Sequence, residues 1–247
     1  MSADSQGNHD PRTDYPERYG KFWKAFQKVG IPALAVCQWA APQIGPPGFE
    51  GPAEWTSGPS TSYRVADDVY HSWHTVVRVW NEALHTIYHN YNGPGHFVDM
   101  DILEVGNGDL TLAEQQTHFA IWAGFKSTLL ASTNLDNPSK ETLQILLNKD
   151  LIAVNQDSLG VPAKLVQRFT GDHDVYSGPL AHGDVFVLLV NLSDSPNNIT
   201  VNFTQVGVAT AQAKNLYTGE HVGAGKSYSA SVDAHESIAL RLSSVKK

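Results

Sequence analysis

The sequence lacks several features that mark common classes of protein. Cys37 is the only cysteine among 247 residues, so no disulfide can form within the chain. The 17 basic residues are scattered and the formal net charge is -8, which leaves no basic face for a phosphate backbone. No hydrophobic run is long enough to cross a bilayer, and the polar residues 1–14 are not a signal peptide. We therefore expect neither nucleic acid nor a membrane as a partner.

Motifs for cofactor chemistry are also missing. The sequence contains no Gly-rich phosphate loop and no nucleophile elbow. Its 11 histidines form no spacing typical of zinc ligands. We expect no cofactor and no metal.

Apolar and amphipathic stretches alternate over the first two thirds of the chain. Short apolar runs are typical of strands in a parallel sheet, and apolar residues at steps of three and four predict helices. Asp67 or Asp68 can cap the helix that follows the second strand. The alternation predicts parallel β/α units with right-handed crossovers. Strands are expected over residues 31–39, 63–66, 97–102 and 128–132, and helices over 17–29, 67–87, 111–125 and 138–147.

After about residue 165 the pattern changes to short β-rich segments separated by Gly, Asp and Asn turns. Such segments predict an antiparallel sandwich of roughly 80 residues. The boundary between the two parts is expected near residues 160–164.

The candidate site consists of polar and aromatic side chains at the ends of successive expected strands. In a parallel β/α fold these ends lie on one rim, where active sites occur. Carboxylates and arginine hydrogen-bond hydroxyl groups, and an indole stacks on a sugar face, so the rim suits a polyol. The set is Cys37, Gln38, Trp39, Arg64, Asp68, Asp99 and Asp101.

Each of these residues also has a purely structural interpretation. Asp68 can be a helix cap, and Arg64 can form a local ion pair with it. Asp99 and Asp101 can be solvated at a strand end, although their spacing of two predicts that they point the same way. Cys37 can be a small buried hydrophobic residue.

Four motifs in order resemble the α-galactosidases of glycoside hydrolase family 27, especially fungal ones. They are Cys37-Gln38-Trp39, then Ser62-Tyr63-Arg64 with Asp68, then residues 93–108 with Asp99-Met100-Asp101-Ile102, and finally residues 153–160. The resemblance implies an α/β fold in which residues 1–162 are the second half of a (β/α)8 TIM barrel, its last four β/α units. Residues 163–247 are then a C-terminal antiparallel β-sandwich.

The resemblance also implies an activity and a role for each site residue. Members of the family hydrolyse terminal non-reducing α-linked galactose with retention. By motif, Asp68 takes the place of the acid/base, and the substrate-binding residues are Arg64, Cys37, Gln38, Trp39, Asp101 and Ile102. Gln38 stands where many members have Glu, Ile102 replaces a pocket Met, and Met100 replaces the Pro between the two aspartates.

The family's first strands and its Lys-x-Asp strand, which bears the nucleophile, have no counterpart here. The chain is therefore expected to be a fragment that self-associates or pairs with a missing N-terminal half. Its expected partners are galactose-containing saccharides. Two alternatives stay open: a non-catalytic carbohydrate-binding remnant, and an α-N-acetylgalactosaminidase.

Localisation is indicated by three glycosylation sequons that begin at Asn191, Asn198 and Asn202. Their clustering favours a secreted origin for the full-length parent.

We predict that the isolated 247-residue chain hydrolyses almost no α-galactoside. A retaining mechanism needs two carboxyl groups, an acid/base and a nucleophile, and the strand that bears the nucleophile has no counterpart here. The measurement is release of nitrophenol from a nitrophenyl α-galactoside by pure chain. Robust turnover would contradict the prediction.

Overall fold

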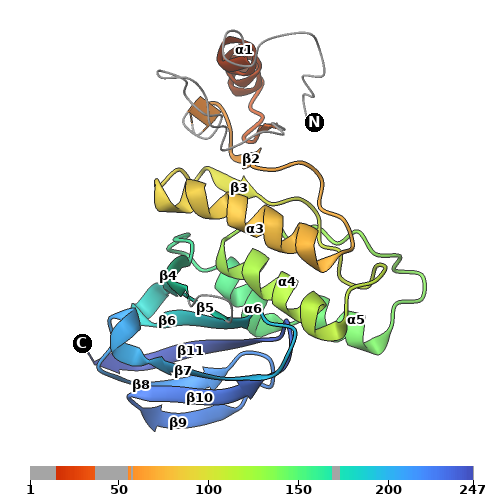
Figure 1. The fold of residues 1–247 in the computed structure, drawn as a ribbon. Coiled ribbons are helices and arrows are strands. Elements are labelled where there is room, and N and C mark those ends of the chain that lie inside the picture. The colour runs from red at the N-terminus through yellow and green to blue at the C-terminus, as the bar shows by residue number, and fades with distance from the viewer. Residues whose placement is uncertain (1–14, 37–54, 57, 169–172, 247) are drawn as a thin grey trace.

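The structure is a computed structural model, and it describes residues 15–36, 55–56, 58–168 and 173–246. Figure 1 shows three regions stacked along the molecule: helix α1 at one end, a parallel sheet with its helices in the middle, and a β-sandwich at the other end. Cys37, Gln38 and Trp39 lie outside the described residues.

The first helix, α1 (Tyr15–Lys28), confirms the helix expected near the N-terminus. Its apolar stripe is only partly covered. Tyr19 is 2% exposed, whereas Phe22 is 47% exposed and Val29, just beyond the helix, is 70% exposed. Phe22 and Val29 therefore stay exposed instead of packing inward.

A short parallel sheet forms the middle of the molecule. Its strands β1 (Ala35–Val36), β2 (Ser62–Arg64) and β3 (Phe97–Asp99) pair in the order β1-β2-β3. Tyr63 of β2 lies between Val36 and Val98 in the register, and all three side chains are buried. Beyond β3, the expected strand over 128–132 reduces to a parallel bridge between Leu103 and Ala131 in the described part of the chain.

Helix α3 (Trp73–Tyr88) begins later than expected. Its N-cap is Ser72, so the expectation that Asp67 or Asp68 caps it is wrong. The Thr75 hydroxyl explains the delay, since it accepts a hydrogen bond from Tyr70 N at 3.2 Å and donates one to Tyr70 O at 2.7 Å. These bonds fix a turn before the helix. Asp68 is left in an irregular segment between β2 and α3, and its carboxylate is not used for capping.

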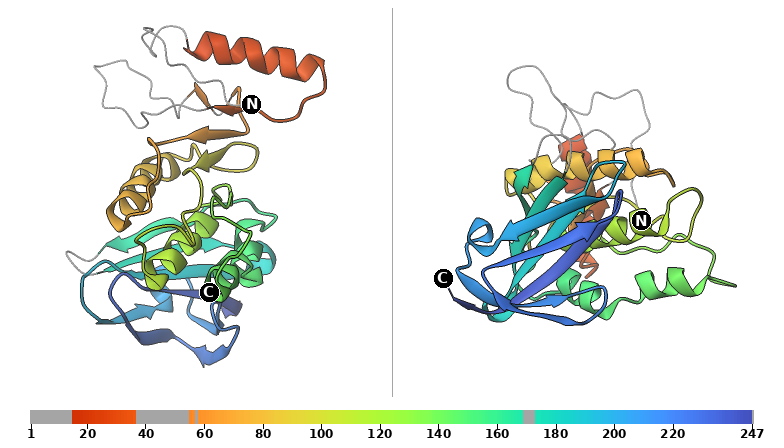
Figure 2. Two further views of the ribbon diagram at one scale, coloured as in Figure 1. Left: turned by 90° about the vertical axis from the view of Figure 1, so that its right-hand side faces the viewer. Right: turned by 60° about the horizontal axis from the view of Figure 1, so that its bottom comes forward.

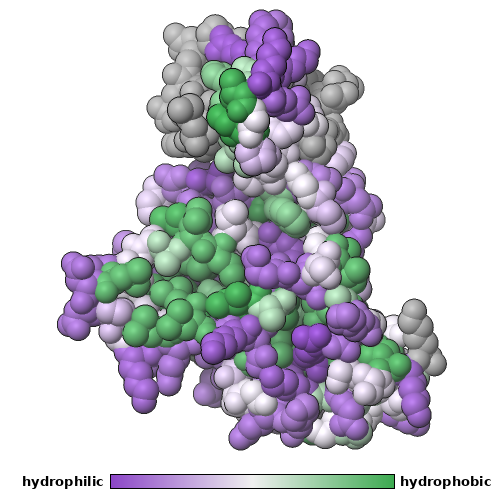
Figure 3. Space-filling model, turned by 180° about the vertical axis from the view of Figure 1, so that it is seen from behind, coloured by the Kyte–Doolittle hydropathy of each residue, from purple (hydrophilic) through white to green (hydrophobic). Residues whose placement is uncertain are grey.

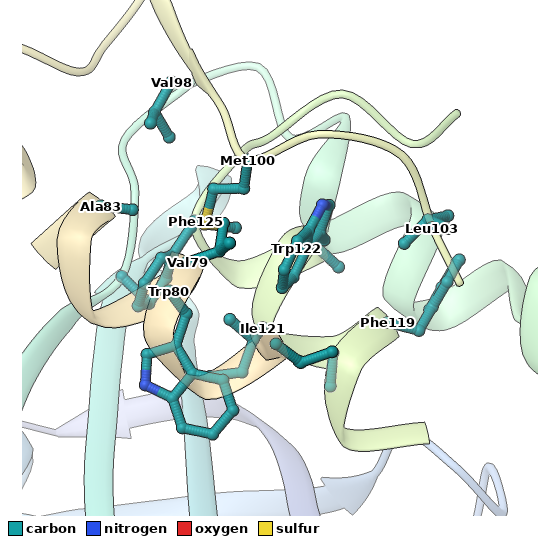
Figure 4. Packing of buried hydrophobic residues seen from close by; sticks show 14 of the residues in the cluster. Val79, Trp80, Ala83, Val98, Met100, Leu103, Phe119, Ile121, Trp122 and Phe125 are labelled. Atoms are coloured by element: carbon teal, nitrogen blue, oxygen red, sulfur yellow. The ribbon is translucent and has the colours of Figure 1, made fainter. Parts of the chain in front are cut away.

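Helix α4 (Leu112–Gly124) occupies the centre of the core. A capping box formed by Thr111 and Glu114 opens the helix, which was expected over residues 111–125. Figure 4 shows Trp122 and Ile121 of α4 packed among side chains from α3 and from the segment after β3, with Trp80 and Met100 among them. The face toward the sandwich is covered as well, because Phe186 fills the space over Gly124.

Two short helices follow, α5 (Lys140–Leu146) and α6 (Lys149–Asn155). The first was expected from the sequence and the second was not. Asn148 caps α6 by accepting a hydrogen bond from Leu151 N at 2.9 Å.

The C-terminal part is a two-layered antiparallel β-sandwich. One layer pairs in the order β4-β5-β6-β11-β8-β9 and the other is the pair β10-β7, and a second hydrophobic core lies among their side chains. Figure 2 shows the two layers from other sides. The bounds are β4 (Lys164–Arg168), β5 (His173–Pro179), β6 (Val185–Asn191), β7 (Asn197–Asn202), β8 (Thr210–Asn215), β9 (His221–Gly225), β10 (Ser227–Val232) and β11 (Ser237–Lys246), with short 3-10 turns η1 (Ala181–Gly183) and η2 (Phe203–Val206).

The two parts meet along α4. Its Thr117 hydroxyl donates to the carbonyl of His235 at 2.9 Å, and Gly124 O accepts from Ala163 N at 2.8 Å. Parallel β/α units followed by an antiparallel sandwich confirm the expected fold class. The division at residue 162 stays a prediction.

Acid stability should depend on His118 of α4. Its side chain is completely buried, Nε2 accepts a hydrogen bond from Glu104 N at 3.0 Å, and Nδ1 has no partner in the described part of the chain. Burial lowers the pKa of His118 from 6.5 to about 3. The unfolded chain therefore takes up the proton first, and stability that is complete above pH 6.5 falls as the pH drops toward 3.

We predict that His118→Gln flattens this acid limb, because glutamine can accept the same hydrogen bond without titrating. The wild-type free energy of unfolding should fall by up to about 1.4 kcal/mol per pH unit more steeply than that of the variant. Urea denaturation between pH 6.5 and roughly pH 4.5 measures it. Parallel curves would contradict the assignment.

Candidate active site

Arg64 is the centre of the candidate site. It is the last residue of β2, and its Nη2 lies 3.2 Å from Asp68 Oδ1 and 3.1 Å from Asp101 Oδ2. The same nitrogen donates to Ala66 O at 3.3 Å. Arg64 and Asp101 are 12% and 13% exposed, whereas the Asp68 side chain is 52% exposed. One guanidinium therefore links a nearly buried carboxylate to one that solvent can reach.

Asp101 is fixed by its backbone and by its side chain. It has a left-handed conformation with φ of 74°, which is unusual for a residue other than glycine. Its carbonyl accepts from Trp122 Nε1 at 2.9 Å, and Oδ2 accepts from Val69 N at 2.9 Å. These bonds compensate the strained backbone and tie the segment that carries Asp68 to the end of β3.

Asp99, the last residue of β3, binds the backbone of Asp101. Its Oδ1 accepts from Asp101 N at 2.8 Å and from the Thr128 hydroxyl at 3.3 Å. Burial raises the pKa of Asp99, although these hydrogen bonds and the positive charge of Arg64 act in the opposite direction. The expectation that Asp99 and Asp101 point the same way assumed a strand through residue 102, and this basis is wrong because β3 ends at Asp99.

The structure thus brings Arg64, Asp68 and Asp101 into direct contact. Ile102 follows Asp101 and is a half-buried residue packed against the core. The site residues before β2 lie outside the described part of the chain. β1 pairs in parallel with β2 and its last residue is Val36, directly before Cys37.

Two contributions to the site had no signal in the sequence. Trp122 was expected only as part of a helix, and Val69 only as part of an apolar stripe. Trp122 lies 21 residues after Asp101 and Val69 lies 32 residues before it. No local pattern connects residues so far apart.

The site offers a solvent-accessible carboxyl group beside a fixed positive charge. Such a pair can exchange a proton with a substrate and hold its oxygen atoms by charge-assisted hydrogen bonds. Within the described residues, no group of three or more His, Cys, Asp or Glu side chains is arranged to hold a metal ion. No helix described is long and apolar enough to cross a membrane.

The sequence matches the models of two known protein families. Residues 6–157 match the family model described as Alpha galactosidase A, and residues 170–242 match the Alpha galactosidase C-terminal beta sandwich domain. The chain belongs to the alpha-galactosidase A family. The resemblance to fungal α-galactosidases of glycoside hydrolase family 27 is confirmed.

Individual relatives agree with this assignment. The chain is 34% identical to a probable alpha-galactosidase D of Aspergillus fumigatus over 243 residues, which are 95% of this chain and 36% of the relative. Among solved structures, alpha-galactosidase I of Mortierella vinacea superposes with a TM-score of 0.84 at 27% identity, covering 96% of this chain and 65% of that one.

A relative of another specificity has the same fold. A family 27 β-L-arabinopyranosidase of Geobacillus stearothermophilus superposes with a TM-score of 0.79 at 25% identity, covering 93% of this chain and 54% of that one.

The chain spans about a third of the length of the curated relatives that it matches, 36% for the Aspergillus fumigatus protein.

We predict that Asp101→Asn destabilises the fold by about 2 kcal/mol, because it leaves the guanidinium of Arg64 without its nearly buried charged partner and with only the half-exposed Asp68. The half-exposed Asp68 is the matched control, and Asp68→Asn should cost less than about 1 kcal/mol. Urea denaturation at neutral pH measures both. Equal losses would show that Asp101 does not anchor the site.

Proposed function

We propose that this chain is part of an α-galactosidase that hydrolyses terminal non-reducing α-linked galactose in oligosaccharides and polysaccharides with retention. The observation that carries the proposal is the group of Arg64, Asp68 and Asp101, joined at 3.2 Å and 3.1 Å at the carboxyl ends of parallel strands in a chain of this family. We also propose that residues 1–162 are the last four β/α units of the barrel and residues 163–247 the sandwich.

Asp68 has the proposed role of acid/base. Its carboxyl group is 52% exposed, so a glycosidic oxygen can approach it. Protonated Asp68 donates its proton to the leaving-group oxygen in the first step. In the second step its carboxylate removes a proton from the water that releases the sugar.

The other site residues have proposed roles in holding the sugar. Arg64 carries several N–H donors, and its ion pair with Asp101 fixes the direction of the guanidinium. Ile102, beside Asp101, is a proposed apolar contact. Cys37, Gln38 and Trp39 are proposed to line the same pocket. Retention also requires a carboxylate nucleophile at roughly 5 Å from the acid/base, and none is assigned among the residues of this chain.

We propose that the full-length parent is secreted, and the sandwich contains the three sequons that favour this. Two sequon asparagines, Asn198 and Asn202, are exposed on β7. Asn191 is completely buried, and its side-chain nitrogen donates to Ser195 O, Val232 O and Asp233 O. We propose glycosylation at Asn198 and Asn202 and not at Asn191 in the folded chain.

The parallel sheet suggests a protein partner as well. β1 pairs with β2 on one side and has no second neighbour among the described residues. Hydrophobic residues also gather over the face shown in Figure 3. Exposed leucines in the barrel part include Leu130, Leu135 and Leu159. We propose that this part self-associates or pairs with a complementary N-terminal half, since an unpaired edge and apolar surface favour association.

The test uses the product expressed from the gene's own transcript, assayed on nitrophenyl α-galactoside, α-N-acetylgalactosaminide and β-L-arabinopyranoside and on an unactivated α-galactoside such as raffinose. We expect the α-galactosides to be the preferred substrates. Preference for either of the other two sugars, or hydrolysis of none, would refute the proposal.

We predict that Asp68→Ala lowers kcat/KM, which reports the first step alone, by about 10² to 10⁴ on the unactivated galactoside, the usual contribution of a general acid. The loss should be smaller on the nitrophenyl substrate, because nitrophenolate leaves without protonation. The variant Asp184→Ala, which removes a carboxylate of the sandwich, is the control and should keep wild-type rates. Equal losses on both substrates would rule out acid catalysis by Asp68.

A further inference from the structure

The segment that carries Asp68 has no regular structure of its own. It runs from Val65 to Ser72 between β2 and α3. Val65, Ala66 and Val69 are buried, while the side chains of Asp67 and Asp68 point to solvent. The direction of the Asp68 carboxyl group therefore depends on bonds that neighbouring elements make to these two exposed residues.

One such bond comes from α3. Arg78 lies in the second turn of that helix, and its Nη1 forms an ion pair with the Asp67 carboxylate. Its Nη2 donates to the backbone carbonyl of Asp68 at 3.4 Å, and Nη1 also lies 3.4 Å from Glu82. The hydrogen bond with Asp67 is the main cause that raises the pKa of Arg78, and an arginine side chain stays protonated in proteins. A single guanidinium thus holds both a side chain and a carbonyl of the Asp68 segment.

The segment is also held by the site itself. Val69 N donates to Asp101 Oδ2 at 2.9 Å, and Asp68 Oδ1 accepts from Arg64 Nη2 at 3.2 Å. Asp67 and Asp68 are therefore held by Arg78 and by the pair Arg64 and Asp101. Without Arg78, the end at Asp67 has no other ion pair among the described residues.

We propose that Arg78 is a positioning residue that aims the Asp68 carboxyl group by fixing the backbone at Asp67 and Asp68 from helix α3. The catalytic meaning rests on the proposed function, in which Asp68 is the acid/base. Arginine suits this task because its planar fork donates in two directions at once, whereas lysine presents one compact charge. Arg78 is also the positive charge beside Asp67, so it offsets the negative charge next to Asp68.

The first test measures the segment directly in the 247-residue chain. Backbone amide hydrogen exchange is compared for wild type, Arg78→Gln and Arg78→Lys. We expect Arg78→Gln to speed exchange at Val69, whose N–H is hydrogen-bonded to Asp101, by about three- to tenfold through local opening. Arg78→Lys should restore part of the protection, since it keeps the charge but not the fork.

The matched control is Arg241→Gln in the sandwich. Arg241 is 35% exposed and lies 2.6 Å from Asp184, while Arg78 is 34% exposed. The control removes the ion pair of a similarly exposed arginine from β11 and should leave exchange at Val69 unchanged. Exchange within twofold of wild type in Arg78→Gln, or an equal increase throughout α3 and α4, would overturn the proposal.

The second test addresses the chemistry in the product of the gene's own transcript. We expect Arg78→Gln to lower kcat on an unactivated α-galactoside by about tenfold, with KM nearly unchanged, because the acid is misdirected while the sugar contacts remain. A rise in KM alone would overturn the positioning role. If the wild-type product hydrolyses no galactoside, the proposed function fails, and the exchange experiment still decides whether Arg78 holds the segment.

Discussion

The contact of Arg64 with Asp101 is the constraint on which the candidate site depends. Arg64 lies at the end of β2 and Asp101 just after β3, so their ion pair at 3.1 Å joins the ends of two parallel strands. Both side chains are nearly buried, and the low local dielectric strengthens their attraction. The same two residues hold the segment of Asp68, through its carboxylate and through Val69 N. The half-exposed carboxyl group of Asp68 is thus held in place by two nearly buried residues, Arg64 and Asp101.

Much of this fold can be predicted from the sequence, because its longer elements carry strong local patterns. The stripe from Trp73 to Ile87 and the capping box at Thr111 are local signals, and α3 and α4 follow them. Errors occur where a single side-chain hydrogen bond decides where a helix starts. The start of α3 is set by the Thr75 hydroxyl bonded to Tyr70, and no propensity rule anticipates that bond. Helix α6 depends on a single cap, Asn148.

The candidate site likewise has features that the sequence predicts and features that it does not. Order along the chain predicts that Arg64, Asp68 and Asp101 share an edge, because parallel strands end on the same side. The left-handed backbone of Asp101 and the support from Trp122 and Arg78 arise from elements distant in sequence. Sequence patterns therefore indicate which chemical groups are present, whereas the bonds that aim them depend on the packed structure.

The burial of α4 on both sides has a consequence for how the chain can be divided. One hydrophobic cluster includes Trp122 and Ile121 together with Phe186 and Ala239 of the sandwich. The two family models divide the chain between residues 157 and 170, yet this cluster extends across that division. A boundary that separates two evolutionary modules is therefore not a boundary between two independent units of folding. The sandwich excludes solvent from one face of α4, so exchanging it for that of a relative would require that face of α4 to be exchanged with it.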